Sequence, residues 1–207
     1  MPTAELEALL PSSFRGIPPV PPRRKRWTRD ECAVLEAAGA FADQHVELID
    51  GELIDKMGKN GPHILVVELI RQWLFSVFGA GFVLQEAPID VRAADNRINE
   101  PEPDAIALKR HMRTFVESRP GPADLHLVVE VSDSTLYSDL TTKAALYARA
   151  GIPEYWVVDI AGRRLVAHRE PNGGIYSDVQ VHGENEDVAP LSSPMSNLRI
   201  GELFDTQ

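Results

Sequence analysis

The sequence predicts a single α/β domain built around a mixed β-sheet, and three observations lead to that prediction. Apolar runs of strand length alternate with segments of helical periodicity from Trp27 onwards. One run, Leu125–Val131, is apolar and β-branched almost throughout, as in strands that are covered on both faces. Of the 207 residues, 43% are hydrophobic and 25% are charged, and no linker divides the middle of the chain. We therefore expect one core rather than two.

Residues 1–26 are expected to form a Pro-rich, basic N-terminal arm, and residues 27–207 the folded domain. Six of the 16 prolines lie between Pro2 and Pro22, and the basic run 23–26 (RRKR) follows them. Because proline resists both helix and sheet, we expect an extended arm with at most a short helix at Ala4–Leu10. The basic run either contacts phosphate or is a solvated tail.

The first half of the domain is expected to contain a helix, a hairpin, a second helix and a strand. Thr28 is a plausible N-cap for a helix ended by Gly39. An Asp-Gly pair between two apolar runs predicts a β-hairpin. Pro62 begins the second helix, which Gly79 and Gly81 end. The expected bounds are Arg29–Ala38, Val46–Ile54, His63–Phe78 and Phe82–Val91.

The second half completes the sheet. Two further strands precede a helix that Gly151 closes, and another buried strand follows that helix. The expected bounds are Pro103–Leu108, Leu125–Val131, Ser138–Ala150 and Glu154–Ile160, with a β-rich tail beginning at Arg164–Arg169. The central order is therefore helix, three strands, helix, strand.

Charge and cysteine content limit the classes of protein that fit. The net charge is −10, which disfavours long-range attraction to nucleic acid but allows a locally basic groove or a neutralising metal. Cys32 is the single cysteine, so the sequence contains neither an internal disulfide nor a cysteine-based zinc cluster. No apolar run approaches the length of a membrane span, and no signal peptide is recognisable. We expect a cytoplasmic protein that does not enter membranes.

Three charged residues fall on elements that should be buried. Glu130 lies near the end of the most apolar strand, where a carboxylate is costly unless it is paired or bound to metal. Asp104 lies at the start of another strand, so the two carboxylates meet if these strands are neighbours. Lys143 lies on the inward stripe of the following helix, between Leu140 and Tyr147.

This combination is suited to phosphodiester hydrolysis. Asp104, Glu130, the main-chain carbonyl of Val131 and water would give Mg²⁺, or Mn²⁺, an oxygen-rich site. A bound metal activates water, and Lys143 could orient that water or stabilise charge on the phosphate. The alternative is a structural ion pair between Lys143 and one of the carboxylates.

Pro103-Asp104 followed by Glu130-Val131-Ser132 resembles the signature of the PD-(D/E)XK nuclease superfamily. A closer resemblance is to the Uma-two family of putative restriction-endonuclease-like proteins. It spans roughly Trp27 to Phe204 and rests on VELIDGEL (46–53), PEPDAIAL (101–108) and the specific stretch LVVEVSDSTLYSDLTTKAALYARAGIPEYWVVD (127–159). The resemblance implies a restriction-endonuclease-like α/β sandwich. The superfamily lysine normally lies two residues after the acid, at Ser132 here, so Lys143 would substitute from the helix.

The resemblance and the helix positions add candidates. Glu47 matches the first acidic position of the family and could complete the metal shell, or it could face solvent. Glu68 competes for that role. His63 is a site residue or only part of a helix N-terminus, and Asp139 either holds Lys143 or favours its helix terminus. We expect Tyr147 to be a core residue.

The leading expectation is a Mg²⁺-dependent endonuclease that acts on DNA, with Asp104, Glu130, Lys143 and Glu47 as its catalytic residues. A second hypothesis is a non-cleaving regulator that keeps the fold and binds nucleic acid or protein. A third is a structural or partner-binding protein whose long apolar helix and β-rich tail build a homodimer. A homodimer is also expected for the nuclease.

Overall fold

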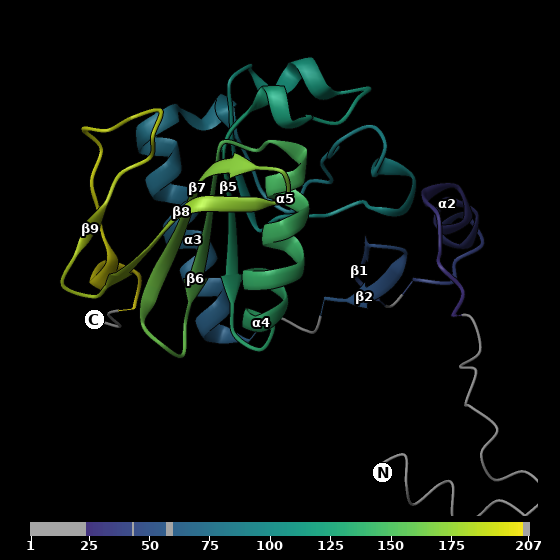
Figure 1. Ribbon diagram of the computed structural model, residues 1–207, viewed down its shortest axis with the longest axis horizontal. Helices are drawn as coiled ribbons and strands as arrows, with labels where there is room; N and C mark the ends of the chain where they lie inside the picture. The colour runs from purple at the N-terminus through teal and green to yellow at the C-terminus, as the bar shows by residue number, and fades with distance from the viewer. Residues whose placement is uncertain (1–23, 43, 57–59, 205–207) are drawn as a thin grey trace, which may run out of the picture.

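The computed structural model describes residues 24–42, 44–56 and 60–204. Its centre is a six-stranded sheet of order β3-β4-β5-β6-β7-β8, in which β5 and β6 are parallel and the other neighbours are antiparallel (Figure 1). The strands are β3 (Val83–Leu84), β4 (Ala105–Leu108), β5 (Leu125–Ser132), β6 (Glu154–Asp159), β7 (Arg164–Asn172) and β8 (Ile175–Gly183).

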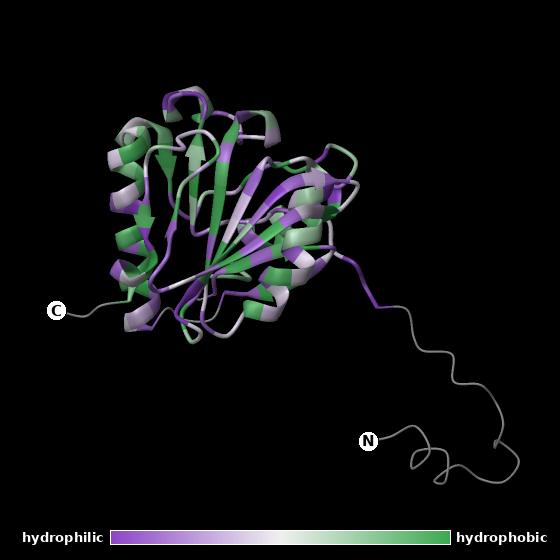
Figure 2. Ribbon diagram, turned by 60° about the vertical axis from the view of Figure 1, so that its left-hand side comes forward, coloured by the Kyte–Doolittle hydropathy of each residue, from purple (hydrophilic) through white to green (hydrophobic). Residues whose placement is uncertain are grey.

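Helices cover both faces of this sheet, and Figure 2 shows the hydrophobic residues concentrated between them. Helix α3 (Gly61–Phe78) packs on one face, where its buried residues join one core cluster with Trp156. The other face is covered by a continuous helical segment made of α4 (Leu136–Ser138), the π-helical turn η6 (Asp139–Lys143) and α5 (Ala144–Ala150). The buried strands β5 and β6 therefore form the centre of a sandwich.

Smaller elements surround the sandwich. Helix α2 (Arg29–Ala37) begins at Thr28 with a capping box to Glu31. The hairpin turns at Asp50-Gly51, both with positive φ, as a two-residue hairpin turn requires. The remaining elements are β1 (Val46–Ile49), β2 (Glu52–Asp55), η2 (Ala80–Phe82), η3 (Asn96–Ile98), η4 (Met112–Phe115), η5 (Pro122–Asp124), β9 (Asp187–Val188), β10 (Leu198–Arg199) and η7 (Ile200–Leu203).

The predicted element order is confirmed, with α3, β3–β5, the α4–η6–α5 segment and β6 in sequence. The strand expected at Phe82–Val91 is wrong beyond Leu84. Glu86 has a positive φ and Pro88 has no N–H to donate, so the chain runs on as an irregular segment. The helix expected at Ser138–Ala150 begins earlier and contains a π-turn. The possible helix at Ala4–Leu10 lies outside the described residues.

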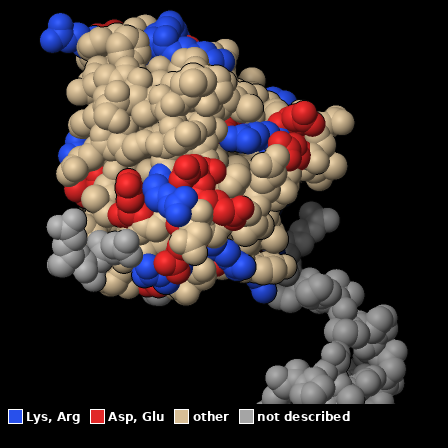
Figure 3. Space-filling model, turned by 90° about the vertical axis from the view of Figure 1, so that its left-hand side faces the viewer, with Lys and Arg blue, Asp and Glu red and all other residues tan. Residues whose placement is uncertain are grey.

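The exposed surface carries mixed charge. On the side that bears β9, acidic and basic side chains are interspersed around an area without charged groups (Figure 3). Within the described ranges, no helix is both long enough and apolar enough to cross a membrane.

Candidate active site

Asp104 and Glu130 lie side by side at one end of two neighbouring strands. Strand β4 pairs antiparallel with β5, and Ala105 is the register partner of Val129. The next position of this register brings Asp104 beside Glu130. Because side chains alternate between the faces of a sheet, Glu130 points, like Val128, to the face that α5 covers. Asp104 lies at the end of the sheet, where it contacts Val131 and His63. Both carboxylates are buried, with exposed fractions of 4% and 3%.

Each carboxylate uses one oxygen for contacts within the protein. Asp104 Oδ2 accepts a hydrogen bond from the backbone N–H of Val131 at 2.8 Å and lies 3.5 Å from His63 Nε2. Glu130 Oε1 accepts hydrogen bonds from Lys143 Nζ and from the Tyr147 hydroxyl, both at 3.0 Å. Among the described residues, these contacts leave Asp104 Oδ1 and Glu130 Oε2 for a ligand. In each carboxylate, one oxygen is therefore engaged in contacts within the protein and the other is open to a ligand.

The π-turn η6 brings Lys143 to this pair. The Ala144 N–H donates to the carbonyl of Asp139, the i to i−5 bond of a π-helix. Asp139 and Lys143, at the two ends of this turn, are both buried, while Thr141 and Thr142 between them are exposed. Lys143 Nζ reaches Glu130 Oε1, and it also lies 2.7 Å from Glu47 Oε1. The sequence-predicted trio Asp104, Glu130 and Lys143 thus lies together.

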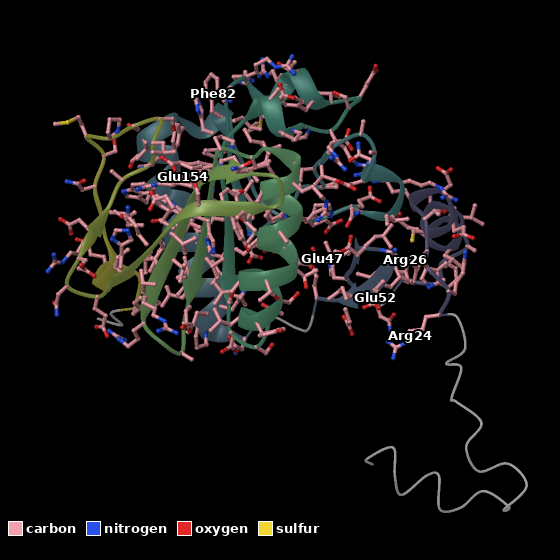
Figure 4. The ribbon with its side chains drawn as sticks, viewed as in Figure 1. Arg24, Arg26, Glu47, Glu52, Phe82 and Glu154 are labelled. Carbon is pink, nitrogen blue, oxygen red and sulfur yellow. The ribbon has the colours of Figure 1, made fainter. Side chains whose placement is uncertain are left out.

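Glu47 joins the site from the β1–β2 hairpin. Its second oxygen, Oε2, accepts the backbone N–H of Glu102 at 3.3 Å, so the hairpin is tied to the segment that precedes Asp104. Figure 4 shows Glu47 on the side of the hairpin nearest α5, whereas Glu52 lies further out. The alternative that Glu47 faces solvent is wrong, because its exposed fraction is 4%.

Asp139 lies behind Lys143. Its Oδ1 is 3.8 Å from Lys143 Nζ, and its Oδ2 accepts hydrogen bonds from Ser132 Oγ at 2.7 Å and Thr135 Oγ1 at 2.6 Å. Ser132 occupies the usual lysine position of the superfamily signature. Here that position is buried, and its hydroxyl holds the carboxylate that faces Lys143.

Burial and nearby opposite charges shift the pKa values of the site residues in opposite directions. Burial raises the pKa of Glu130 to about 8, although Lys143 opposes the rise and the neighbouring carboxylates add to it. Burial also acts to raise the pKa of Asp104, but the hydrogen bond from His63, the charge of Lys56 and the Val131 amide lower it below its usual value. Burial lowers the pKa of Lys143, but Glu130, Glu47 and Asp139 outweigh burial and raise it.

These groups line a pocket of about 80 Å³, which is large enough for a metal ion and a few water molecules. Its walls include every residue predicted for the site except Asp139, which lies behind it: Glu47, His63, Asp104, Glu130, Val131 and Lys143. In the described part of the chain, no three carboxylate, imidazole or thiol groups form a ready metal cluster by themselves. The expected Mg²⁺ site needs only two carboxylates, with a carbonyl and water for the rest, and the two available oxygens fit that requirement.

One candidate from the sequence lies outside the site, and other residues of the site were missed. Glu68, the competitor of Glu47, lies on the exposed side of α3 and pairs with Arg71 at 2.6 Å. Tyr147 is a core residue as expected, but its hydroxyl also contacts Glu130. Its position one helical turn after Lys143, on the same stripe of the helix, was the sequence signal that could have indicated this contact. Lys56 and Asn60 also line the pocket, and no pattern in the sequence pointed to them.

Comparisons with known proteins gave one family match and a match among solved structures. The Uma2 family model, described as "Putative restriction endonuclease", matches residues 31–200. Among solved structures, the chain is similar to a putative nuclease belonging to DUF820 from Anabaena variabilis ATCC 29413. The TM-score is 0.61, and the match covers 78% of this chain and 90% of that chain. The two sequences are 15% identical, so the likeness concerns the restriction-endonuclease-like fold. No curated protein matches the chain.

Proposed function

The chain belongs to the Uma2 family of putative restriction endonucleases, and on this basis we propose that it is a Mg²⁺-dependent endonuclease that hydrolyses DNA. The observation that carries the proposal is the meeting of Asp104, Glu130 and Lys143 in one pocket, with an oxygen of each carboxylate left for a ligand. Two carboxylate oxygens and a carbonyl suit a hard divalent cation, so Mg²⁺ is the proposed metal and Mn²⁺ a substitute.

Asp104 Oδ1, Glu130 Oε2 and the Val131 carbonyl would hold the ion. When bound, it supplies an activated water and offsets negative charge on the scissile phosphate. Lys143 Nζ has three donors, and two of them are directed to Glu47 and Glu130. The third can orient the attacking water or donate to a phosphate oxygen. Water attacks phosphorus, one P–O ester bond breaks, and the leaving oxygen takes up a proton.

The flanking residues maintain this geometry. Asp139 and Glu47 keep Lys143 charged and fixed in direction, because both carboxylates lie within 4 Å of Nζ. His63 holds Asp104 Oδ2 from the start of α3. The Asn60 N-cap fixes the same helix start and donates to Asp133 across the pocket at 2.5 Å.

Plasmid cleavage with Mg²⁺ tests the proposal. Asp104→Asn removes a metal ligand and Lys143→Ala removes the donor, so both should lose cleavage. Glu68→Ala is the matched control, because it removes a carboxylate on α3 that lies outside the pocket. Circular dichroism checks that each variant is folded. Equal cleavage by wild type, Asp104→Asn and Lys143→Ala would refute the assignment of the site.

A second candidate function is a non-cleaving regulator that keeps the nuclease fold, and the net charge of −10 favours it. Such a protein would bind DNA or a protein partner without metal. Calorimetric titration with Mg²⁺ and Mn²⁺ separates the two functions. Absence of binding at millimolar metal, together with intact folding, would favour the regulator.

A further inference from the structure

The hydroxyl of Tyr147 marks this residue as more than a packing group. Tyr147 is fully buried, and its ring packs edge-on against Tyr155 with centroids 4.9 Å apart. Packing of that kind requires only the ring. The hydroxyl nevertheless lies 3.0 Å from Glu130 Oε1, the oxygen that also accepts Lys143 Nζ. A buried hydroxyl is costly without a partner, and here the partner is a carboxylate of the site.

We propose that Tyr147 is a positioning residue that holds Glu130 so that Oε2 alone is presented to the metal. This inference rests on the proposed function. Two donors on Oε1 fix the rotation of the carboxylate about its terminal bond, which is otherwise broad. Without the hydroxyl, Lys143 alone would hold Oε1, and Glu47 competes for the same ammonium group at 2.7 Å. The carboxylate would then sample orientations that do not suit a metal ligand.

Tyr147 is itself held in place by Tyr155, against which its ring packs. Tyr155 donates its hydroxyl to the carbonyl of Asp139 at 3.1 Å, within the π-turn that carries Lys143. Tyr147 follows Lys143 by one turn of the same helix. The two donors of Glu130 Oε1 therefore come from one continuous helical segment, a geometry that preserves their convergence on a single oxygen.

Calorimetric titration of Mn²⁺ into Tyr147→Phe tests the role, with Tyr176→Phe as the matched control. Tyr176 is a buried tyrosine of the same core cluster, and its hydroxyl donates to the carbonyl of Ile152, away from the carboxylates. Loss of a residue that orients a metal ligand typically weakens metal binding by about 10- to 100-fold, so we expect a decrease of this size for Tyr147→Phe only. Excess Mn²⁺ should restore its plasmid cleavage.

Three outcomes would overturn the inference. If Tyr147→Phe binds Mn²⁺ as tightly as the wild type does, the hydroxyl positions nothing. If both variants are weakened alike, the effect belongs to the core. If the wild type itself binds no Mn²⁺, the inference fails together with the metal dependence of the proposed function. Wild-type binding and cleavage with unchanged affinity in Tyr147→Phe would refute the inference alone.

A different feature, the outer edge of β8, carries a second inference. β8 is the last strand of the sheet and contains nine residues, without proline or lysine to protect its edge. Ile175, Val179 and Val181 are 67%, 49% and 57% exposed. They border a groove of about 480 Å³ whose opposite wall includes Leu140 and Ala144.

We infer that the occupant of this edge is a second copy of the chain, paired antiparallel through β8. Self-pairing with Gln180 on the two-fold axis places Val179 opposite the partner's Val181. The same register places Asp178 opposite the partner's His182, so the single acidic group of the strand meets an imidazole rather than its own copy. Directly opposed apolar side chains stabilise a sheet, and all these pairs occur twice in a two-fold dimer.

Light scattering across a concentration series tests the dimer. We expect the wild type to be dimeric and Val181→Lys to be monomeric, because the lysine would face an apolar partner surface. Val116→Lys is the control, since Val116 is 81% exposed at the C-terminal end of η4, away from β8. A wild type that stays monomeric, or a Val181→Lys variant that still dimerises, would refute the interface.

Discussion

Replacing Glu130 by glutamine should make the metal-free protein increasingly more stable than the wild type as the pH rises. The pKa of Glu130 is raised by burial from 4.5 to about 8. Between these pH values the folded state keeps a proton that the unfolded state has released, so the wild type loses stability with rising pH. Glutamine has no such proton, and its side-chain oxygen can still accept from Lys143 and Tyr147.

The size of this stability difference follows from the rise in the pKa of Glu130. At about 1.4 kcal/mol for each pH unit, a rise in pKa from 4.5 to about 8 corresponds to several kcal/mol. The stabilising contribution of protonated Glu130 is complete below pH 4.5 and is lost as the pH passes through 8. We therefore expect the variant to gain several kcal/mol in free energy of unfolding, relative to the wild type, between pH 5 and pH 8.

Urea denaturation in EDTA at several pH values measures this difference. A gap between the two proteins that stays constant from pH 5 to pH 8 would refute the reasoning. Glu154→Gln is a useful contrast, because Glu154 is a buried carboxylate that pairs with Arg169 at 2.8 Å. Removing its charge should lower stability at neutral pH, since Arg169 would lose its partner. Mn²⁺ should reduce the wild-type loss, because metal binds the deprotonated carboxylate.

Three further predictions concern stability. Lys143→Met should destabilise the metal-free protein by about 3–5 kcal/mol in urea denaturation, because the buried carboxylates of Glu47 and Asp139 would lose their shared cation and Glu130 would lose a hydrogen-bond donor; unchanged stability would contradict this. Trp156→Ala should cost about 3–5 kcal/mol, since the side chain is fully buried beside Trp73, and a smaller loss in thermal unfolding would argue against that packing. Gly151→Ala should cost roughly 1–2 kcal/mol, because Gly151 has φ +78° and the site has open space, so the penalty is backbone strain alone. A stabilised alanine variant would show that this strain is absent.

The sequence determined the fold class and the chemical character of the site. The apolar run of β5 predicted the centre of the sheet, because a strand covered on both faces has no polar alternation. A carboxylate on that run and a lysine on the inward stripe of the next helix could be recognised as unusual without coordinates, since ionised groups are rarely buried without partners.

Only the tertiary structure decided the contacts of these buried charged residues and the local backbone that carries them. Asp139, the first residue of the π-turn, accepts hydrogen bonds from Ser132 at the end of β5, from Thr135 just before α4 and from Tyr155 on β6. Sequence periodicity predicts an ordinary helix there, because Leu140, Ala144, Tyr147 and Ala148 follow helical spacing and contain no signal of a wider turn. The early end of β3 was missed for a similar reason: a positive φ at Glu86 is set by the surrounding chain rather than by residue type.

The division of oxygens within each carboxylate is also a tertiary property. Asp104 and Glu130 were predicted as ligands by their types and strand positions, but which oxygen remains for a metal depends on donors far away in the sequence. Val131 lies 27 residues after Asp104, and Tyr147 lies 17 residues after Glu130. Sequence alone therefore determined which charges are buried, and the fold decided their direction, because direction is set by donors that only the assembled sandwich brings together.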